Sequence, residues 1–153
     1  MNKLVVPNEI MLAEVSSLIA EGKEVIIMTK GSSMLPFIRG DADSVALVAK
    51  DPVAPGDISL AEIAKGKYVL HRVRKVEAGV VTLKGDGNLT GIERCAEVHV
   101  CGVVKTILKA SGREIDPASG WQRLMWRCWV LIPRLGRRFI LHFARKNNKT
   151  DND

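Results

Sequence analysis

Residues 31–41 read Gly-Ser-Ser-Met-Leu-Pro-Phe-Ile-Arg-Gly-Asp, and they follow a β-branched run at 25–27. The run predicts a strand, and Gly31 permits the tight or left-handed backbone of a turn directly after it. Pro36 fixes its own φ and favours an extended Leu35. The two adjacent serines therefore lie where a strand ends in a constrained turn. Such a turn can present a nucleophile, and it is also how ordinary serine-rich loops are built.

Three more short motifs follow the serine turn along the chain. They are Gly-Asp at 56–57, His-Arg-Val at 71–73 and Gly-Asp-Gly-Asn at 85–88. Together with Ser-Met-Leu-Pro at 33–36, their order resembles the type I signal peptidase superfamily, which includes the LexA-like self-cleaving repressors. The histidine resembles the Ser-His branch of that superfamily, typical of the endoplasmic reticulum and of archaea. The resemblance covers about residues 25–104.

The resemblance implies a serine nucleophile that is activated by a histidine base. It assigns the nucleophile to Ser33, which directly precedes Met34, and the general base to His71. A serine hydroxyl needs a base to attack at neutral pH, and imidazole titrates in the suitable range. A lone histidine in an apolar strand is more often a buried core residue. The catalytic role of His71 therefore depends on the motifs around it.

A third group is expected to orient the imidazole. The resemblance assigns this role to Asp86, although an Asp-Gly pair after a strand is equally typical of a hairpin turn. The Ser-His branch carries a second aspartate several residues later. Here that position falls near Ile92, beside Glu93, and holds no aspartate. Three alternatives stay open: Glu93 substitutes, Asp86 orients His71 alone, or the third group is dispensable.

The expected oxyanion site departs from that of the bacterial signal peptidases, which place a serine two residues before the nucleophile. Gly31 occupies that position here, so no side chain can donate from it. The backbone N–H of Ser33 remains a candidate donor, and Ser32 offers a hydroxyl beside it. Loss of one oxyanion donor typically lowers the rate by about 10²-fold or more. This departure predicts a slow or specialised enzyme.

Residues 24–110 are predicted to form one mainly antiparallel β domain. The pair Ala78-Gly79 predicts a tight hairpin, and Pro55-Gly56-Asp57 predicts a turn. The predicted fold is mainly β within the α+β class, a coiled antiparallel sheet or partial barrel as the resemblance implies. Short runs rich in β-forming residues, separated by Gly, Pro or Asp, lie at 25–28, 44–49, 57–60, 68–76, 80–84 and 98–108.

Helices are expected on both sides of the β domain. Residues 1–23 contain a predicted amphipathic helix at about 9–21 that packs on the sheet. Residues 111–145 form a basic, Trp-rich segment that is predicted to be helical and broken at Pro133, and residues 146–153 a disordered end. Because the N-terminal segment has neither a signal-peptide pattern nor an apolar anchor, we expect a cytoplasmic protein, or one peripheral on the inner face of the membrane.

The net charge of +6 resides in the C-terminal tail. From residue 121 onward there are eight Lys and Arg against two Asp, which leaves fifteen basic and fifteen acidic residues before it. Tryptophans among arginines at Trp121–Phe143 suit a membrane–water interface. The alternative is a helical hairpin packed on the domain with an arginine-rich outer face. A nucleic-acid partner is not expected, since such proteins more often spread basic residues over a folded face.

The three cysteines, Cys95, Cys101 and Cys128, form no Cys-x-x-Cys pair. They predict reduced, buried thiols, with no metal site and no cofactor. Together these features predict a serine endopeptidase of signal-peptidase type that cleaves a peptide or protein precursor, such as a leader. The main alternative is a catalytically inactive peptide-binding module on the same fold. The sequence leaves the oligomeric state open.

Overall fold

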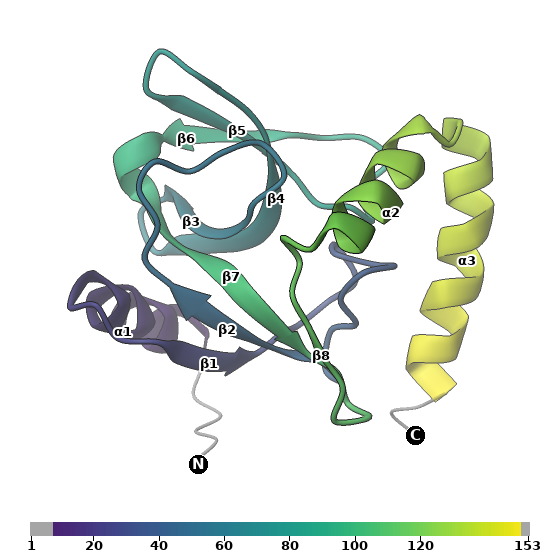
Figure 1. Ribbon diagram of the computed structural model, residues 1–153, viewed down its shortest axis with the longest axis horizontal. Helices are drawn as coiled ribbons and strands as arrows, with labels where there is room; N and C mark the ends of the chain where they lie inside the picture. The colour runs from purple at the N-terminus through teal and green to yellow at the C-terminus, as the bar shows by residue number, and fades with distance from the viewer. Residues whose placement is uncertain (1–7, 151–153) are drawn as a thin grey trace.

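The computed structural model describes residues 8–150 of the 153-residue chain, with side chains from Met11 onward (Figure 1). In this range the protein is a mixed α+β structure with a mostly antiparallel eight-stranded sheet and three α-helices. The elements are α1 (Asn8–Ala20), β1 (Val25–Met28), β2 (Ser44–Val48), β3 (Ile58–Ala64), β4 (Lys67–Glu77), β5 (Val80–Lys84), β6 (Glu93–Ala96), the 3₁₀ turn η1 (Glu97–His99), β7 (Val100–Leu108), β8 (Glu114–Ile115), α2 (Gly120–Leu131) and α3 (Arg134–Thr150).

The sheet is strongly curled but does not close into a barrel. Its strands run in the order β1-β2-β7-β3-β4-β5-β6, and the short β8 pairs with β7. Strands β4 and β5 form the predicted hairpin at Ala78 and Gly79, whose φ angles of 50° and 75° are those that a tight two-residue turn needs. The prediction of a mainly antiparallel, coiled sheet is confirmed at this level.

Two apolar clusters fill the molecule. One lies within the curl of the sheet and includes Val73, Leu83 and Val103. The other, which includes Leu35 and Leu47, lies between the sheet, α1 and the C-terminal helices. Burying a large aliphatic side chain stabilises a fold by about 1.5–3 kcal/mol. Strands β1 and β2 and the turn that follows β1 are therefore held mainly by the second cluster.

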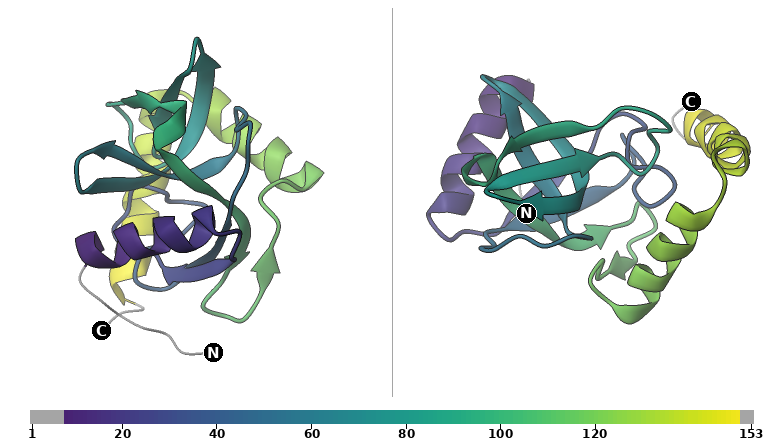
Figure 2. Two further views of the ribbon diagram at one scale, coloured as in Figure 1. Left: turned by 90° about the vertical axis from the view of Figure 1, so that its left-hand side faces the viewer. Right: turned by 90° about the horizontal axis from the view of Figure 1, so that it is seen from above.

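The helices lie at opposite ends of the molecule, α1 on one side of the sheet and the hairpin of α2 and α3 on the other (Figures 1 and 2). Helix α1 packs as predicted, with Val15 and Ile19 buried. Gly102 of β7 makes room for it, since a Cβ there would come within 3.1 Å of the Ile19 side chain. The chain bends at Pro133 between α2 and α3, also as predicted.

Several expectations need correction. The strands β6 and β8 were not predicted, because Glu-Arg-Cys-Ala and Glu-Ile are short and show no apolar alternation. Residues 146–150 are helical rather than disordered, since α3 continues to Thr150, and residues 151–153 lie outside the described range. Cys95 is buried, but Cys128 is exposed. Within residues 8–150, no helix combines the length and the apolar character that crossing a bilayer requires.

Candidate active site

Ser33 lies in the serine loop, residues 29–43, which connects β1 to β2. Gly31 has a φ of +74°, so the turn before Ser33 uses the left-handed backbone that its sequence permits. The loop then turns on itself, with the N–H groups of Phe37 and Ile38 both donating to the carbonyl of Met34 at 3.0 Å. Met34, which follows Ser33 in the motif, is buried together with the other apolar side chains of the loop. The loop therefore has its own apolar anchor.

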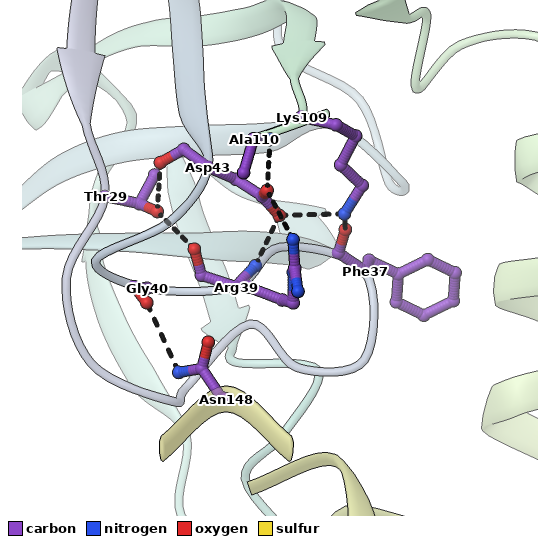
Figure 3. A network of polar contacts seen from close by, with 8 residues as sticks. All are labelled: Thr29, Phe37, Arg39, Gly40, Asp43, Lys109, Ala110 and Asn148. Atoms are coloured by element: carbon purple, nitrogen blue, oxygen red, sulfur yellow. Dashed lines mark hydrogen bonds and ion pairs between the residues drawn. The ribbon is translucent and has the colours of Figure 1, made fainter. Parts of the chain in front are cut away.

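Asp43 closes the base of the serine loop (Figure 3). Its carboxylate, which is fully buried, accepts hydrogen bonds from the Arg39 N–H at 2.8 Å, the Ala110 N–H at 3.1 Å and Lys109 Nζ at 2.8 Å. Burial by itself raises the pKa of Asp43, but these hydrogen bonds outweigh burial and hold the pKa below its ordinary value of 3.8. Lys109 also donates to the carbonyl of Phe37 at 2.7 Å. The charged network thus ties the second half of the loop to the residues that follow β7.

A second loop, Gly85-Asp86-Gly87, supports Ser33 directly. The N–H of Gly87 donates to the carbonyl of Ser33 at 2.8 Å. The approach is so close that a Cβ on Gly85 would lie 2.5 Å from the Ser33 carbonyl oxygen, and one on Gly87 would lie 2.5 Å from that of Ser32. Real Cβ atoms do not come so near to carbonyl oxygens, so both positions require glycine. The two glycines of the Gly-Asp-Gly-Asn motif therefore let this loop contact the serine turn.

His71 is held by Glu93. The ring nitrogen Nδ1 lies 2.9 Å from Oε2 of Glu93, and the histidine side chain is only 7% exposed. A carboxylate at Nδ1 favours the tautomer with a proton on Nδ1, which leaves Nε2 free to accept a proton. Of the two acids that the sequence left as candidates, Glu93 is therefore the one that contacts the imidazole.

Asp86 makes a different contact from the predicted one. Its carboxylate forms a bidentate ion pair with Arg72, with Nη2 of Arg72 at 2.7 Å from Oδ2 and Nε at 3.0 Å from Oδ1. Both side chains are buried. Burial raises the pKa of Asp86, and the guanidinium of Arg72 opposes that rise. The prediction that Asp86 contacts His71 is wrong. The Asp86 carboxylate binds Arg72, and His71 contacts Glu93 instead.

The reason for this exchange of partners is the alternation of side chains along a strand. His71 and Arg72 are consecutive in β4 and point to opposite faces. Arg72 faces the C-terminal hairpin, where its guanidinium lies 5.1 Å from the ring centre of Trp126 and 5.2 Å from that of Phe37. Glu93 lies on the other face, since it pairs with Leu83, which in turn pairs with Val73, two residues from His71. A sequence motif alone does not show which face each acid reaches.

Helix α2 packs on the Gly85-Asp86-Gly87 loop. Nε1 of Trp129 donates to the backbone carbonyl of Asp86 at 2.9 Å, and the indole is buried edge-on against Phe37. Helix α3 adds two weaker contacts, from Arg145 to the carbonyl of Gly87 and from Asn148 to that of Gly40. The C-terminal hairpin therefore packs on the loops that position Ser33. This agrees with the alternative interpretation of the tail, which predicted a helical hairpin packed on the domain.

One pocket, of about 220 Å³, brings Ser33 and His71 together. Gly31 and Met34 also line it, as do residues of β1, β4 and α1, among them Met28, Tyr68 and Leu12. Within residues 8–150, no hydrogen bond joins the Ser33 hydroxyl to the His71 ring, and neither Ser32 nor Glu93 lines the pocket. Catalytic hydrogen bonds are often long in proteins without substrate and shorten in the complex. The pocket thus contains the predicted nucleophile and base.

Sequence reasoning missed two residues around His71 and Asp86. Arg72, the partner of Asp86, had a usable signal, because an arginine inside an apolar strand needs a buried acid. Ser59 pairs with His71 across β3 and β4, and its fully buried hydroxyl finds no hydrogen-bond partner among the described residues. Nothing in the sequence marks Ser59, since only the register of the two strands brings it beside the histidine.

The site contains no evident metal centre, as no group of three or more His, Cys, Asp or Glu side chains in the described range could hold an ion. Comparison of the chain with models of protein families finds no match, and neither the curated proteins nor the solved structures contain one that matches it.

Proposed function

We propose that this protein is a serine-type endopeptidase in which Ser33 is the nucleophile, His71 the general base and Glu93 the group that orients His71. The observation that carries the proposal is the contact of His71 Nδ1 with Glu93, which leaves Nε2 as the free nitrogen of a ring that lines the same pocket as Ser33. A histidine held by a carboxylate next to a serine on a constrained turn is the arrangement that activates a hydroxyl.

The proposed reaction is acyl transfer to water. Ser33 Oγ attacks the carbonyl carbon of a peptide bond while His71 Nε2 takes its proton, and Glu93 stabilises the imidazolium that forms. His71 then gives the proton to the departing amine, which leaves an ester on Ser33. A water molecule, deprotonated by His71, attacks this ester, and the His71 imidazolium then returns the proton to Ser33 Oγ as the carboxylic acid product leaves. The backbone N–H of Ser33 is the proposed oxyanion donor.

The neighbouring strand supports an extended peptide as substrate. β1 is the first strand of the sheet and pairs only with β2 among the described strands, so one of its edges offers free backbone groups. Residues 27–30 of β1 and its following turn line the pocket opposite residues 68–71 of β4. An extended segment can add to such an edge through main-chain hydrogen bonds. The mainly apolar pocket beside it, which Leu60 and Leu70 also line, would then receive a small apolar side chain.

A serine-reactive phosphonate probe tests the proposal directly. Wild-type protein should gain the mass of one adduct on Ser33, and both Ser33→Ala and His71→Ala should abolish this labelling. Ser111→Ala is the matched control, because Ser111 is an exposed loop serine that does not line the pocket, and it should label like wild type. Folded wild-type protein that gains no adduct, or that labels equally in the Ser33→Ala variant, would contradict the proposal.

The alternative of an inactive peptide-binding module predicts a different result. The observation that favours this alternative is that, within residues 8–150, no hydrogen bond joins the Ser33 hydroxyl to the His71 ring. A module of this kind would bind extended peptides with equal affinity in the wild type and in Ser33→Ala, and it would cleave none of them. Incubation with a peptide library, read by mass spectrometry for new termini, separates the two functions.

A further inference from the structure

Helix α3 carries an apolar stripe on its outward face that packing in the molecule does not explain. Leu135, Phe139 and Phe143 are 78%, 67% and 51% exposed and lie one helical turn apart. Leu141, on the inner face of the same helix, is 1% exposed. A helix that only covers a soluble domain has a polar outer face. Leu131, the last residue of α2, is also 82% exposed.

The flanks of the stripe are basic. Helix α3 contains no acidic residue, and its exposed cations include Arg138, Lys146 and Lys149. Of the three tryptophans that suggested an interfacial tail, Trp129 is buried and Trp126 half-buried, so only Trp121, at 66% exposed, remains at the surface. A surface contact is therefore expected from the apolar stripe of α3 rather than from the tryptophans.

We propose that the apolar stripe (Leu135, Phe139 and Phe143) binds the surface of a bilayer that contains anionic lipid. Aromatic and leucine side chains on the outward face would enter the boundary between headgroups and acyl chains, and the basic residues beside them would contact lipid phosphates. The helix would lie parallel to the membrane plane.

Charge complementarity favours an anionic bilayer over two other partners, a second copy of the chain and duplex nucleic acid. A second copy of the chain would bring the same uncompensated cations against the stripe, which opposes self-association. Duplex nucleic acid would engage the cations through its phosphates but would leave the phenylalanines and Leu135 without an apolar partner. Of these three partners, an anionic lipid surface is the one that matches both the apolar centre and the basic flank.

The hairpin would also fix the position of the pocket relative to the lipid. Its inner face contacts the loops that hold Ser33, through Trp129 to the carbonyl of Asp86 and Asn148 to that of Gly40. The binding proposal is independent of catalysis, because the stripe and the pocket share no residue.

Flotation of the full-length protein with lipid vesicles tests the binding. Wild-type protein should float with vesicles of phosphatidylcholine and phosphatidylglycerol, and much less with phosphatidylcholine alone. The double variant Phe139→Ser/Phe143→Ser should lose about tenfold or more in apparent affinity. Its matched control is Val80→Ser/Val98→Ser, which removes two exposed apolar side chains remote from α3 and should bind like wild type.

A charge series tests the basic flank in the same assay. Arg138→Gln/Lys146→Gln should weaken binding by about tenfold or more, while Lys65→Gln/Lys67→Gln, which removes two exposed lysines at the β3–β4 turn, should not. Three results would overturn the proposal: flotation that does not depend on phosphatidylglycerol, equal binding by the phenylalanine variant and its control, or a lipid-free dimer in sedimentation that the phenylalanine variant abolishes. Circular dichroism checks that each variant keeps its helices.

Discussion

Nδ1 of His71 lies 2.9 Å from Oε2 of Glu93, although their strands, β4 and β6, do not pair with each other. Both strands flank β5, and the side chain of Glu93 reaches across the sheet beyond the end of that strand. The contact therefore depends on the curl and register of three strands. It brings Glu93, and not Asp86, into contact with the histidine.

Glu93→Gln should lower the rate of phosphonate labelling at Ser33 by about tenfold or more, because a neutral amide stabilises neither the required tautomer nor the imidazolium. Glu93 is partly exposed, so the free energy of unfolding should change by less than about 1 kcal/mol. Glu114→Gln, an exposed glutamate on β8, is the control and should label like wild type. Equal labelling rates in the two variants would remove Glu93 from the site.

Asp86→Asn should act mainly on stability. It leaves the buried guanidinium of Arg72 without its counter-charge, and breaking such a pair typically costs about 3–5 kcal/mol. Asp41→Asn is the matched control, since Asp41 is exposed and its positive φ suits asparagine. Urea unfolding measures both variants. A loss of labelling without a loss of stability in Asp86→Asn would instead return Asp86 to the catalytic role predicted from its motif.

Gly87→Ala should damage the site by moving the serine loop. The added methyl group would lie 2.5 Å from the carbonyl oxygen of Ser32 and 3.3 Å from that of Ser33, so the two loops must separate. We expect a loss of about 1–3 kcal/mol in unfolding free energy and a labelling rate lowered by about tenfold or more.

Gly120→Ala provides the comparison for Gly87→Ala. A Cβ at Gly120 meets nothing within 4 Å at the start of α2. Its unfolding free energy should therefore stay within about 0.5 kcal/mol of the wild-type value. If both glycine variants labelled alike, the close contact between the two loops would not position Ser33.

The stability contributed by Asp43 should depend on pH with a definite sign. Its pKa is lowered in the folded protein, so the unfolded chain binds more protons than the folded chain at pH values between the folded pKa and about 5. The stabilisation is therefore complete above the ordinary carboxyl pKa and is lost as the pH falls through the folded pKa.

Asp43→Asn isolates this effect. The variant should be less stable than wild type by about 3 kcal/mol at pH 7, because Lys109 loses its buried partner. The difference should shrink as the pH is lowered from 5 towards 3. Urea unfolding at several pH values measures it, and a difference that stays constant with pH would show that Asp43 does not titrate as its contacts require.

Local sequence determined much of the fold. Val25–Met28 and Val80–Lys84 were predicted as strands with the bounds that the structure gives them, because their β-branched residues end at strong turn signals. The hairpin at Ala78 and Gly79, the left-handed Gly31 and the helix break at Pro133 follow from the backbone restrictions of single residues or pairs. Such features need no knowledge of distant contacts.

Only the tertiary structure decided which side chains contact each other. Adjacent residues of a strand face opposite ways, so whether an acid reaches His71 or Arg72 depends on the register and curl of β4, β5 and β6, which the local sequence does not encode. The sequence also did not show that Phe139 points outward, because the face of an amphipathic helix that becomes buried depends on what packs against it. The sequence determined which residue types lie in strands, turns and helices, and the packing of those elements decided which side chains meet.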